Sequence, residues 1–290
     1  MSFYDVVIAP FADFAFMRRA LVGLLALALG SAPIGVFLVL RRMSLMGDAL
    51  THAVLPGAAI GYLVAGPSIG AMSLGGFAAG LLVAVIAGLI TRFTDMREDA
   101  GIATVFLISL AAGVMIISLR GNPIDLMHIL FGTVLAVDDF ALVLVAAGSS
   151  VTLVLLAVLY RPFVIECFDP GFLRASGAPS GLYHIVFLVL VVLNLVAGFQ
   201  ALGTLMALGM LLLPSVASLF WARSVGAMIA IAWAIAIVAA VAGLIVSFHL
   251  GLPSGPAIVL VAGVLYSLSL LFGRYGSVRQ RYFPFRHLAA

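Results

Sequence analysis

The chain has 290 residues, of which 65% are hydrophobic and only 9% are charged, and its mean hydropathy is +1.32. Soluble domains carry about a quarter charged residues, so this composition predicts an integral membrane protein embedded in a lipid bilayer along its whole length. All 14 basic residues are arginine and the formal net charge is +3. In a membrane protein an arginine excess follows the positive-inside rule, so no nucleic-acid partner is expected. The single Cys167 excludes an internal disulfide and a multi-cysteine zinc site.

Apolar stretches follow one another with short polar breaks, which predicts an all-α bundle of eight to nine transmembrane spans in one domain, residues 1–290. Residues 1–16 are a mixed apolar and acidic lead-in, expected to lie at the membrane interface. The nine candidate spans are residues 20–40, 44–64, 68–90, 99–119, 140–159, 183–198, 203–222, 225–248 and 255–272. Residues 124–137 are too short to cross and predict an interfacial or re-entrant helix.

The arginines also predict the orientation. With nine spans, eleven of the 14 arginines lie on one side of the membrane, which is therefore expected to be the cytoplasm. This side includes a polar segment, residues 160–181, and a basic tail, residues 274–290. The N-terminus would then face outward, and the adjacent Arg18 and Arg19 run against that assignment.

Asp48 is an acidic residue inside an apolar stretch, and His52 follows it four residues later. In a helix these two residues share a face, with Cβ atoms roughly 6 Å apart. A charge at membrane depth costs about 2.5–3.5 kcal/mol or more, so it needs a reason. A carboxylate and an imidazole suit Zn²⁺, Mn²⁺ or Fe²⁺, and two ligands are too few for a closed zinc site. The pair therefore predicts a transient site for a transported metal, which a two-fold dimer would complete with a second pair.

Three other interpretations of the pair stay open. Asp48 and His52 are also compatible with a hydrogen-bonded pair that only locks two helices together. In a secondary transporter the same residues would form a proton relay, and uptake would then collapse with the proton gradient. An importer of a larger chelate, such as a cobalamin or a siderophore, would have no need of either residue.

The polar segment FVIECFDPGFLRASGAPS, residues 163–180, is the second place where chemistry is expected. Asp169 as N-cap and Pro170 at the first helical position predict a short helix from about Pro170 to Ala175. The segment is either an ordinary solvated loop or a docking element that inserts into a groove on a soluble partner. Its candidate coupling residues are Glu166, Asp169, Pro170, Gly171, Phe172, Arg174 and Gly177.

Two lone histidines are candidates for an outer metal path. His128 lies in the short 124–137 stretch, and His249 lies near the expected outer end of a span. Within the second span, the Pro56-Gly57 pair is expected to bend or unwind the helix. Gly75, Gly76 and Gly80 in the third span are expected to let another helix approach closely.

The block RRMSLMGDALTHAVLPG, residues 41–57, closely resembles the signature of the permease subunits of ABC-type importers for zinc, manganese or iron. Further blocks resemble the family in the same order, over about Met17 to Phe272. They are LFGTVLAV (130–137), FDPGFLRASGAPS (168–180), GTLMALGMLLLPSVAS (203–218) and LPSGPAIVLVAG (252–263).

This resemblance implies a permease dimer, most simply a homodimer, in the cytoplasmic (inner) membrane of a bacterium. Each subunit would dock on a cytoplasmic ATPase through a coupling helix at about Glu166 to Ala178, and an extracytoplasmic binding protein would deliver the metal. The family's metal-coordinating residues fall on Asp48 and His52. The chain has no GxxxxGK[ST] phosphate loop, so it is expected to be no enzyme, with ATP hydrolysed by a separate chain. No tightly bound cofactor is expected. Zinc is the first choice of transported ion, manganese the second and ferrous iron the third.

Overall fold

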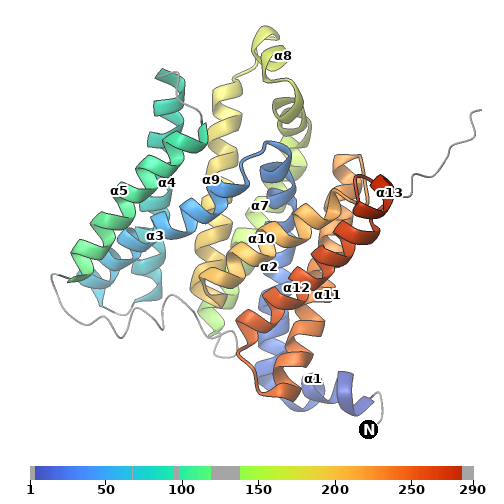
Figure 1. Ribbon diagram of the computed structural model, residues 1–290. Helices are drawn as coiled ribbons and strands as arrows, with labels where there is room; N and C mark the ends of the chain where they lie inside the picture. The colour runs from blue at the N-terminus through green and yellow to red at the C-terminus, as the bar shows by residue number, and fades with distance from the viewer. Residues whose placement is uncertain (1–3, 67, 94–97, 119–137, 283–290) are drawn as a thin grey trace, which may run out of the picture.

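The computed structural model describes residues 4–66, 68–93, 98–118 and 138–282, and these are helical apart from short connections (Figure 1). The described elements in chain order are η1 (Tyr4–Ile8), α1 (Ala9–Asp13), α2 (Ala15–Leu40), α3 (Ser44–Ala65), α4 (Ile69–Phe93), α5 (Glu98–Ser118), α7 (Asp139–Phe168), α8 (Pro170–Ala175), α9 (Ser180–Leu202), α10 (Thr204–Ser218), α11 (Val225–Leu250), α12 (Ser254–Phe272) and α13 (Val278–Tyr282). The predicted all-α membrane bundle is confirmed. The expected helix at 124–137 lies outside the described residues.

Within the described part of the chain, seven helices are long and apolar enough to cross a membrane: α2, α3, α4, α7, α9, α11 and α12. The two other predicted spans coincide with shorter apolar stretches, Ala103–Gly113 within α5 and Thr204–Ser218, which is α10. At a rise of 1.5 Å per residue, α10 is about 22 Å long, less than the ~30 Å hydrocarbon core. The expected span at 203–222 is therefore a shorter helix, because Leu219 to Ser224 leave the helical conformation.

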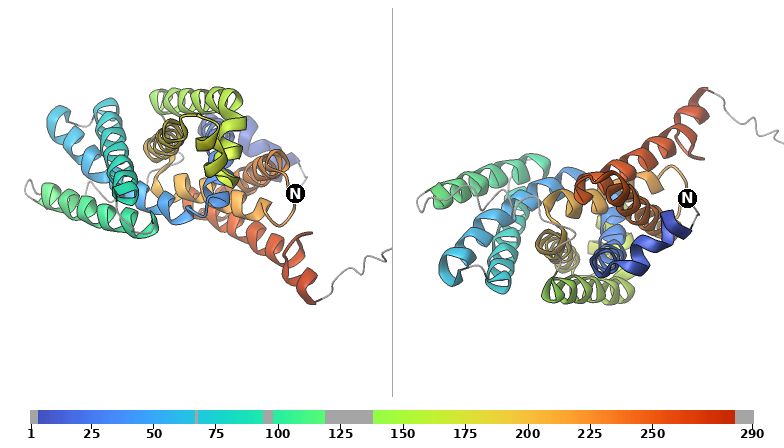
Figure 2. Two further views of the ribbon diagram at one scale, coloured as in Figure 1. Left: turned by 90° about the horizontal axis from the view of Figure 1, so that it is seen from above. Right: turned by 90° about the horizontal axis from the view of Figure 1, so that it is seen from below.

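The helix α2 lies in the middle of the molecule and packs against α7, α9, α10 and α11. The helices α3, α4 and α5 pack on one another as a three-helix group beside it (Figures 1 and 2). This group joins the rest of the bundle mainly through α9 and α10. The short helix α8 projects at one end of the molecule, and the N-terminal elements lie at the other (Figure 1). These are named the α8 end and the N-terminal end below.

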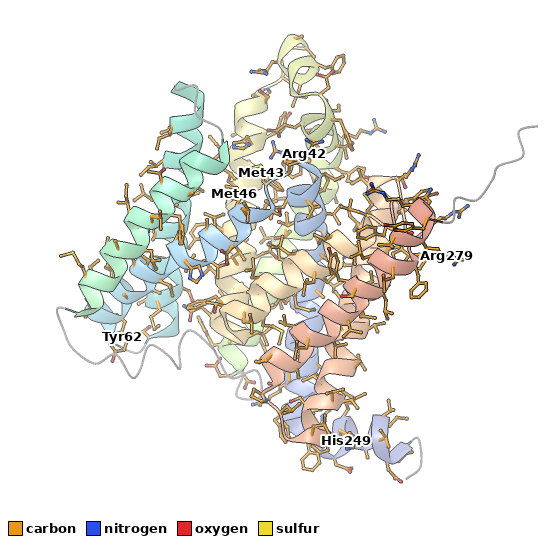
Figure 3. All side chains as sticks on the ribbon, in the orientation of Figure 1. Arg42, Met43, Met46, Tyr62, His249 and Arg279 are labelled. Carbon is orange, nitrogen blue, oxygen red and sulfur yellow. The ribbon has the colours of Figure 1, made fainter. Side chains whose placement is uncertain are left out.

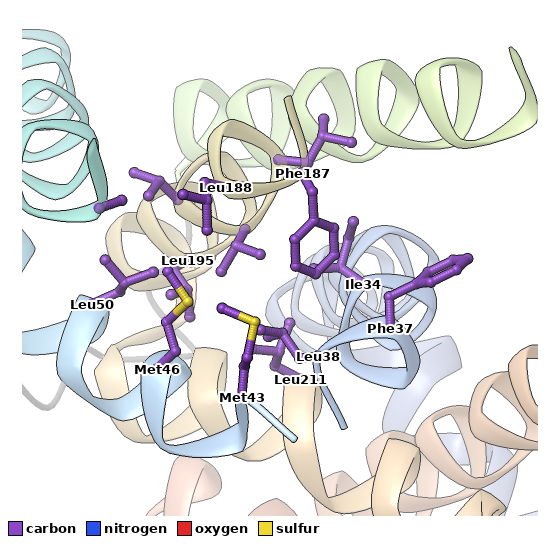
Figure 4. Close-up of a cluster of buried hydrophobic side chains, with 14 of the residues drawn as sticks. Ile34, Phe37, Leu38, Met43, Met46, Leu50, Phe187, Leu188, Leu195 and Leu211 are labelled. Carbon is purple, nitrogen blue, oxygen red and sulfur yellow. The ribbon is translucent and has the colours of Figure 1, made fainter. Parts of the chain in front are cut away.

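A buried hydrophobic cluster anchors the start of α3 to the bundle (Figure 4). Met46 and Leu50 lie one helical turn apart on α3 and are 2% and 0% exposed. They point toward Leu195 of α9 and Leu211 of α10 (Figure 4). Side chains four residues apart share a helix face, so this spacing fixes which face of α3 is turned inward.

The helices α3 and α4 touch backbone to backbone at a pair of glycines. A Cβ atom added to Gly57 would collide with the carbonyl oxygen of Gly75, and the reverse substitution would collide with Gly57. Gly76 faces Val54 of α3 in the same way, and Gly80 faces both Val54 and Val192, which confirms the close packing predicted for these glycines. The expected unwinding at Pro56-Gly57 is absent, since α3 continues as one helix to Ala65.

The helix α2 begins at Ala15, five residues before the predicted start of the first span. Arg18 and Arg19 are therefore part of the helix. An Arg18 guanidinium nitrogen donates to the carbonyl of Ala12 at 2.6 Å, which joins α2 to α1. Arg19 pairs with Asp139 at 3.2 Å, at the N-terminal end of α7. These contacts provide both arginines with partners at the edge of the bundle.

Candidate metal site and coupling segment

Asp48 and His52 form a pair on one face of α3. The Oδ1 atom of Asp48 lies 3.8 Å from Nε2 of His52, and the two side chains are 56% and 40% exposed. At 100° per residue, a side chain two positions after a buried one lies on the opposite side of a helix. Because Met46 and Leu50 are turned inward, Asp48 and His52 are turned outward. The helix thus presents a carboxylate and an imidazole together on a face that the other described residues leave open.

Two other helices flank this pair. On one side, Gly47 packs against α10, where an added Cβ would lie 3.3 Å from Leu208. On the other side, the ring of His52 lies 5.9 Å from the ring of Phe106 on α5, measured between centroids. Leu45, one turn before Asp48, is 70% exposed and continues the same open face toward the α8 end. The pair therefore lies between α5 and α10 on an otherwise apolar surface.

Asp48 and His52 are two candidate metal ligands, and no third candidate joins them in the part of the chain that the structure describes. Among the residues that the structure describes, no group of three or more His, Cys, Asp or Glu side chains is placed to hold a metal ion. A closed tetrahedral site needs four ligands. Asp48 and His52 can therefore hold an ion only with ligands from another source, such as water, a delivery protein or a second copy of the chain.

The short helix predicted from about Pro170 to Ala175 is present, as α8. The Oδ1 atom of Asp169 accepts a hydrogen bond from the backbone N–H of Phe172 at 2.8 Å, so Asp169 is the N-cap, and Pro170 opens the helix. Leu173 is buried and holds α8 to the bundle, whereas Phe172 is 60% exposed. Gly171, Arg174 and Gly177 are exposed too, which gives α8 an outward surface at the end of the molecule.

Glu166 is buried, unlike Asp169, Phe172 and Arg174 of the same segment, which are exposed. Its Oε1 atom lies 2.6 Å from the Arg41 guanidinium, and the two side chains are only 5% and 11% exposed. The sequence predicts Glu166 as part of the surface that docks on the partner, and it does not predict that Glu166 pairs with Arg41. The partners are 125 positions apart in the chain, so no local pattern joins them. The usable signal was an acidic residue in the last turn of a long apolar helix, which needs a partner.

Of the two histidines predicted for an outer metal path, the structure describes only His249. His128 lies outside the described residues. His249 is at the N-terminal end of the molecule (Figure 3), where its Nε2 lies 2.9 Å from the carbonyl oxygen of Val6. A carbonyl can only accept a hydrogen bond, so Nε2 carries the proton in this contact and only Nδ1 is available for a metal.

Comparison with known proteins decides the family. Residues 13–273 match the model of the ABC 3 transport family. The chain belongs to the ABC 3 transport family. It is therefore the multi-pass membrane subunit of an ABC transporter and is not itself the ATPase, as the sequence blocks predicted.

Relatives within the ABC 3 transport family align over nearly the whole chain. The manganese transport system membrane protein MntC of Halalkalibacterium halodurans is 31% identical over 97% of this chain and 94% of its own. The chelated iron transport system membrane protein YfeD of Yersinia pestis is 31% identical over 96% of this chain and 92% of its own. Both names specify manganese or iron, and neither specifies zinc.

Solved structures agree with the fold. PsaBC from Streptococcus pneumoniae, in complex with an Fab, matches with a TM-score of 0.80 at 31% identity, over 95% of this chain and 96% of that one. An inward-facing conformation of a putative metal-chelate type ABC transporter matches with a TM-score of 0.70 at 12% identity, over 87% and 84%. The second likeness shows the ABC importer fold alone.

Proposed function

We propose that this chain is the permease of an ATP-driven importer of Mn²⁺ or Fe²⁺, with Asp48 and His52 as the ligands that hold the ion in transit. The observation that carries the proposal is the half-exposed pair on α3, 3.8 Å apart, in a helix otherwise anchored by apolar packing. The names of the relatives support manganese or iron over the zinc expected first. Carboxylate oxygen suits Mn²⁺, and imidazole suits Fe²⁺ as well as Zn²⁺, so the donor types admit all three ions and the choice rests on the relatives.

The pair is proposed to act in a dimer. Two copies of α3 related by a two-fold axis would place two carboxylates and two imidazoles around one ion. Such a site is isologous, so each subunit contributes the same residues. The open, largely apolar face around Leu45 and the shortage of ligands in one protomer support this arrangement. Four ligands shared between two mobile subunits also permit release, which a site closed within one chain would not.

Transport is proposed to follow alternating access. A binding protein outside the membrane delivers the ion to the Asp48–His52 pairs, and an ATPase docked on α8 drives the change that opens the path to the cytoplasm. The exposed Phe172 on a capped, projecting helix supports α8 as the docking element. Membership of the ABC 3 transport family also sets aside the proton-coupled secondary transporter.

The test is uptake of radioactive manganese into vesicles that contain the permease, its ATPase and its binding protein. We expect ATP-dependent uptake by the wild type, and uptake at background in Asp48→Ala and His52→Ala complexes that still assemble and hydrolyse ATP. Val158→Ala, which trims an exposed apolar side chain on α7 and leaves the pair and its face intact, should transport normally. Normal uptake by the two alanine variants would exclude the pair as the transport site, and uptake of zinc without manganese or iron would exclude the proposed metals.

A further inference from the structure

A second ion pair joins the same two helices as Arg19 and Asp139, at the opposite end. Arg41, the C-cap of α2, meets Glu166 near the end of α7 at 2.6 Å. The guanidinium also lies over the ring of Phe187 on α9, 4.8 Å from its centroid. Nδ1 of His184, also on α9, is 3.7 Å from the same Glu166 oxygen. Three helices thus converge on one buried carboxylate.

Burial makes stabilisation a poor explanation of this pair. Two charges removed from water lose hydration that their mutual attraction only partly restores, so a buried ion pair is weak evidence for stability. The best-supported roles for such pairs are to fix a register or to act in a switch. The exposed Arg19–Asp139 pair already connects α2 to α7 at the N-terminal end without that desolvation.

Arg41 is joined rigidly to the helix that carries Asp48. The backbone N–H of Arg42 donates to Val39, and that of Met43 donates to Leu38, which is the Schellman pattern of a helix end. Arg42 has φ +59°, the left-handed conformation that this corner requires and that a non-glycine residue seldom adopts. Ser44 then begins α3. With one fixed corner between them, Arg41 and the start of α3 move together.

Glu166 has a corresponding connection to α8. It lies in the last turn of α7, three residues before Asp169, the residue that caps α8. The chain between them contains no flexible linker, because α7 ends at Phe168 and α8 begins at Pro170. A displacement of α8 therefore also moves the end of α7 that carries the Glu166 carboxylate.

The surroundings leave space for such a displacement. A cavity of about 550 Å³ lies beside the pair, between α4 on one side and the ends of α7, α8 and α9 on the other. Arg41, Glu166 and His184 line it, together with Arg174 of α8 and Gly88 of α4. On the side that faces α4, the pair is therefore bordered by open space instead of by close-packed side chains.

We infer that the Arg41–Glu166 pair is the link that transmits movement of α8 to the metal-carrying helix α3, so that both residues position the Asp48–His52 site without touching the ion. This inference rests on the proposed function, because it takes α8 as the ATPase docking element and α3 as the metal carrier. It gives Glu166 a role in the buried contact between α2 and α7 instead of a role on the exposed surface of α8.

The experiment measures ATP hydrolysis and manganese uptake in the same reconstituted complexes. For Glu166→Gln, ATP hydrolysis should stay close to wild type while manganese transported per ATP falls by about 5- to 150-fold, the range typical of coupling between sites. The double variant Arg41→Met/Glu166→Leu leaves no unpaired buried charge and should assemble, yet it should show the same low ratio. Asp139→Asn, which breaks the exposed pair between the same helices, is the matched control and should keep the wild-type ratio.

Two other outcomes overturn the inference. A wild-type amount of manganese transported per ATP in the double variant would show that the pair only fills space. Failure of both variants to assemble with the ATPase would show that the pair is required for folding or docking. A wild-type complex that carries neither manganese nor iron would instead overturn the proposed function. The Arg41–Glu166 link could then still be tested with the metal that the complex does carry, by measuring the amount of that metal transported per ATP.

Discussion

The carboxylate of Asp48 and the imidazole of His52 lie 3.8 Å apart on one turn of α3, and both face out of the protomer. The apolar residues on the other side of the same turn, Met46 and Leu50, are buried against α9 and α10. The fold therefore holds the backbone under the pair in place, while the two side chains themselves contribute little to the packing. Binding and stability can be separated experimentally at this site.

The first prediction uses this separation. Asp48→Asn and His52→Gln should leave the metal-free protein at least as stable as the wild type, because neither side chain is buried in the packing and Asp48→Asn removes a charge from an apolar face. Manganese at 100 times its dissociation constant should stabilise the wild type by about 2.7 kcal/mol, and both variants should lose that gain. Thermal unfolding with and without Mn²⁺ measures both effects. Leu45→Ala should keep the manganese-dependent shift, and a shift that persists in the ligand variants would contradict the site.

The second prediction concerns the dimer, and the single Cys167 makes it testable. In a Cys167→Ser background, Leu45→Cys should be joined to its copy in a second subunit by a short thiol-reactive cross-linker, since it lies on the face that carries Asp48. Val158→Cys on α7 is 71% exposed as well, but it is on another helix and should remain monomeric. Non-reducing gels separate the two products. Equal cross-linking at both positions would indicate random collision, and none at Leu45 would place the two-fold axis elsewhere.

The third prediction concerns docking of the ATPase. Phe172→Ala should reduce co-purification of the ATPase with the permease, because an aromatic side chain 60% exposed on α8 is the type of anchor that a groove binds. Asp169→Ala should weaken docking indirectly, since loss of an N-cap costs about 1 kcal/mol of helix stability. Leu182→Ala, exposed nearby on α9, is the comparison. Full ATPase recovery with Phe172→Ala would mean that α8 is an ordinary solvated turn.

The fourth prediction tests the contact between α3 and α4. Gly57→Ala adds a methyl group where the carbonyl of Gly75 already lies, so it should destabilise the protein by about 1–3 kcal/mol, as overpacking does. Gly263→Ala makes the same chemical change inside α12, where nothing lies within 4 Å of the added atom. It should be neutral or stabilise by up to about 1 kcal/mol. Thermal unfolding compares the two, and a Gly57→Ala protein as stable as Gly263→Ala would show that the helices separate easily.

Much of the secondary structure could be predicted because its causes are local. Apolar runs of about 20 residues locate the seven long helices, and Asp169-Pro170 specifies where α8 begins through one side-chain cap and one fixed φ angle. The 15-residue α10 was predicted too long, because apolar residues continue past Ser218 although the helix stops there. Hydrophobic composition alone therefore does not predict the end of α10 at Ser218.

The sequence by itself determined the class of protein, the approximate places of the long helices, and the i,i+4 spacing that puts Asp48 beside His52, because each depends on residues close together in the chain. It did not determine where α2 begins or where α7 and α10 end. Only the tertiary structure decided that this pair faces outward, since that depends on which side of α3 packs against α9 and α10. It also decided that Glu166 is buried against Arg41 instead of exposed with Phe172. A contact between residues 125 positions apart is set by how whole helices pack, and no local pattern around Arg41 or Glu166 identifies the partner.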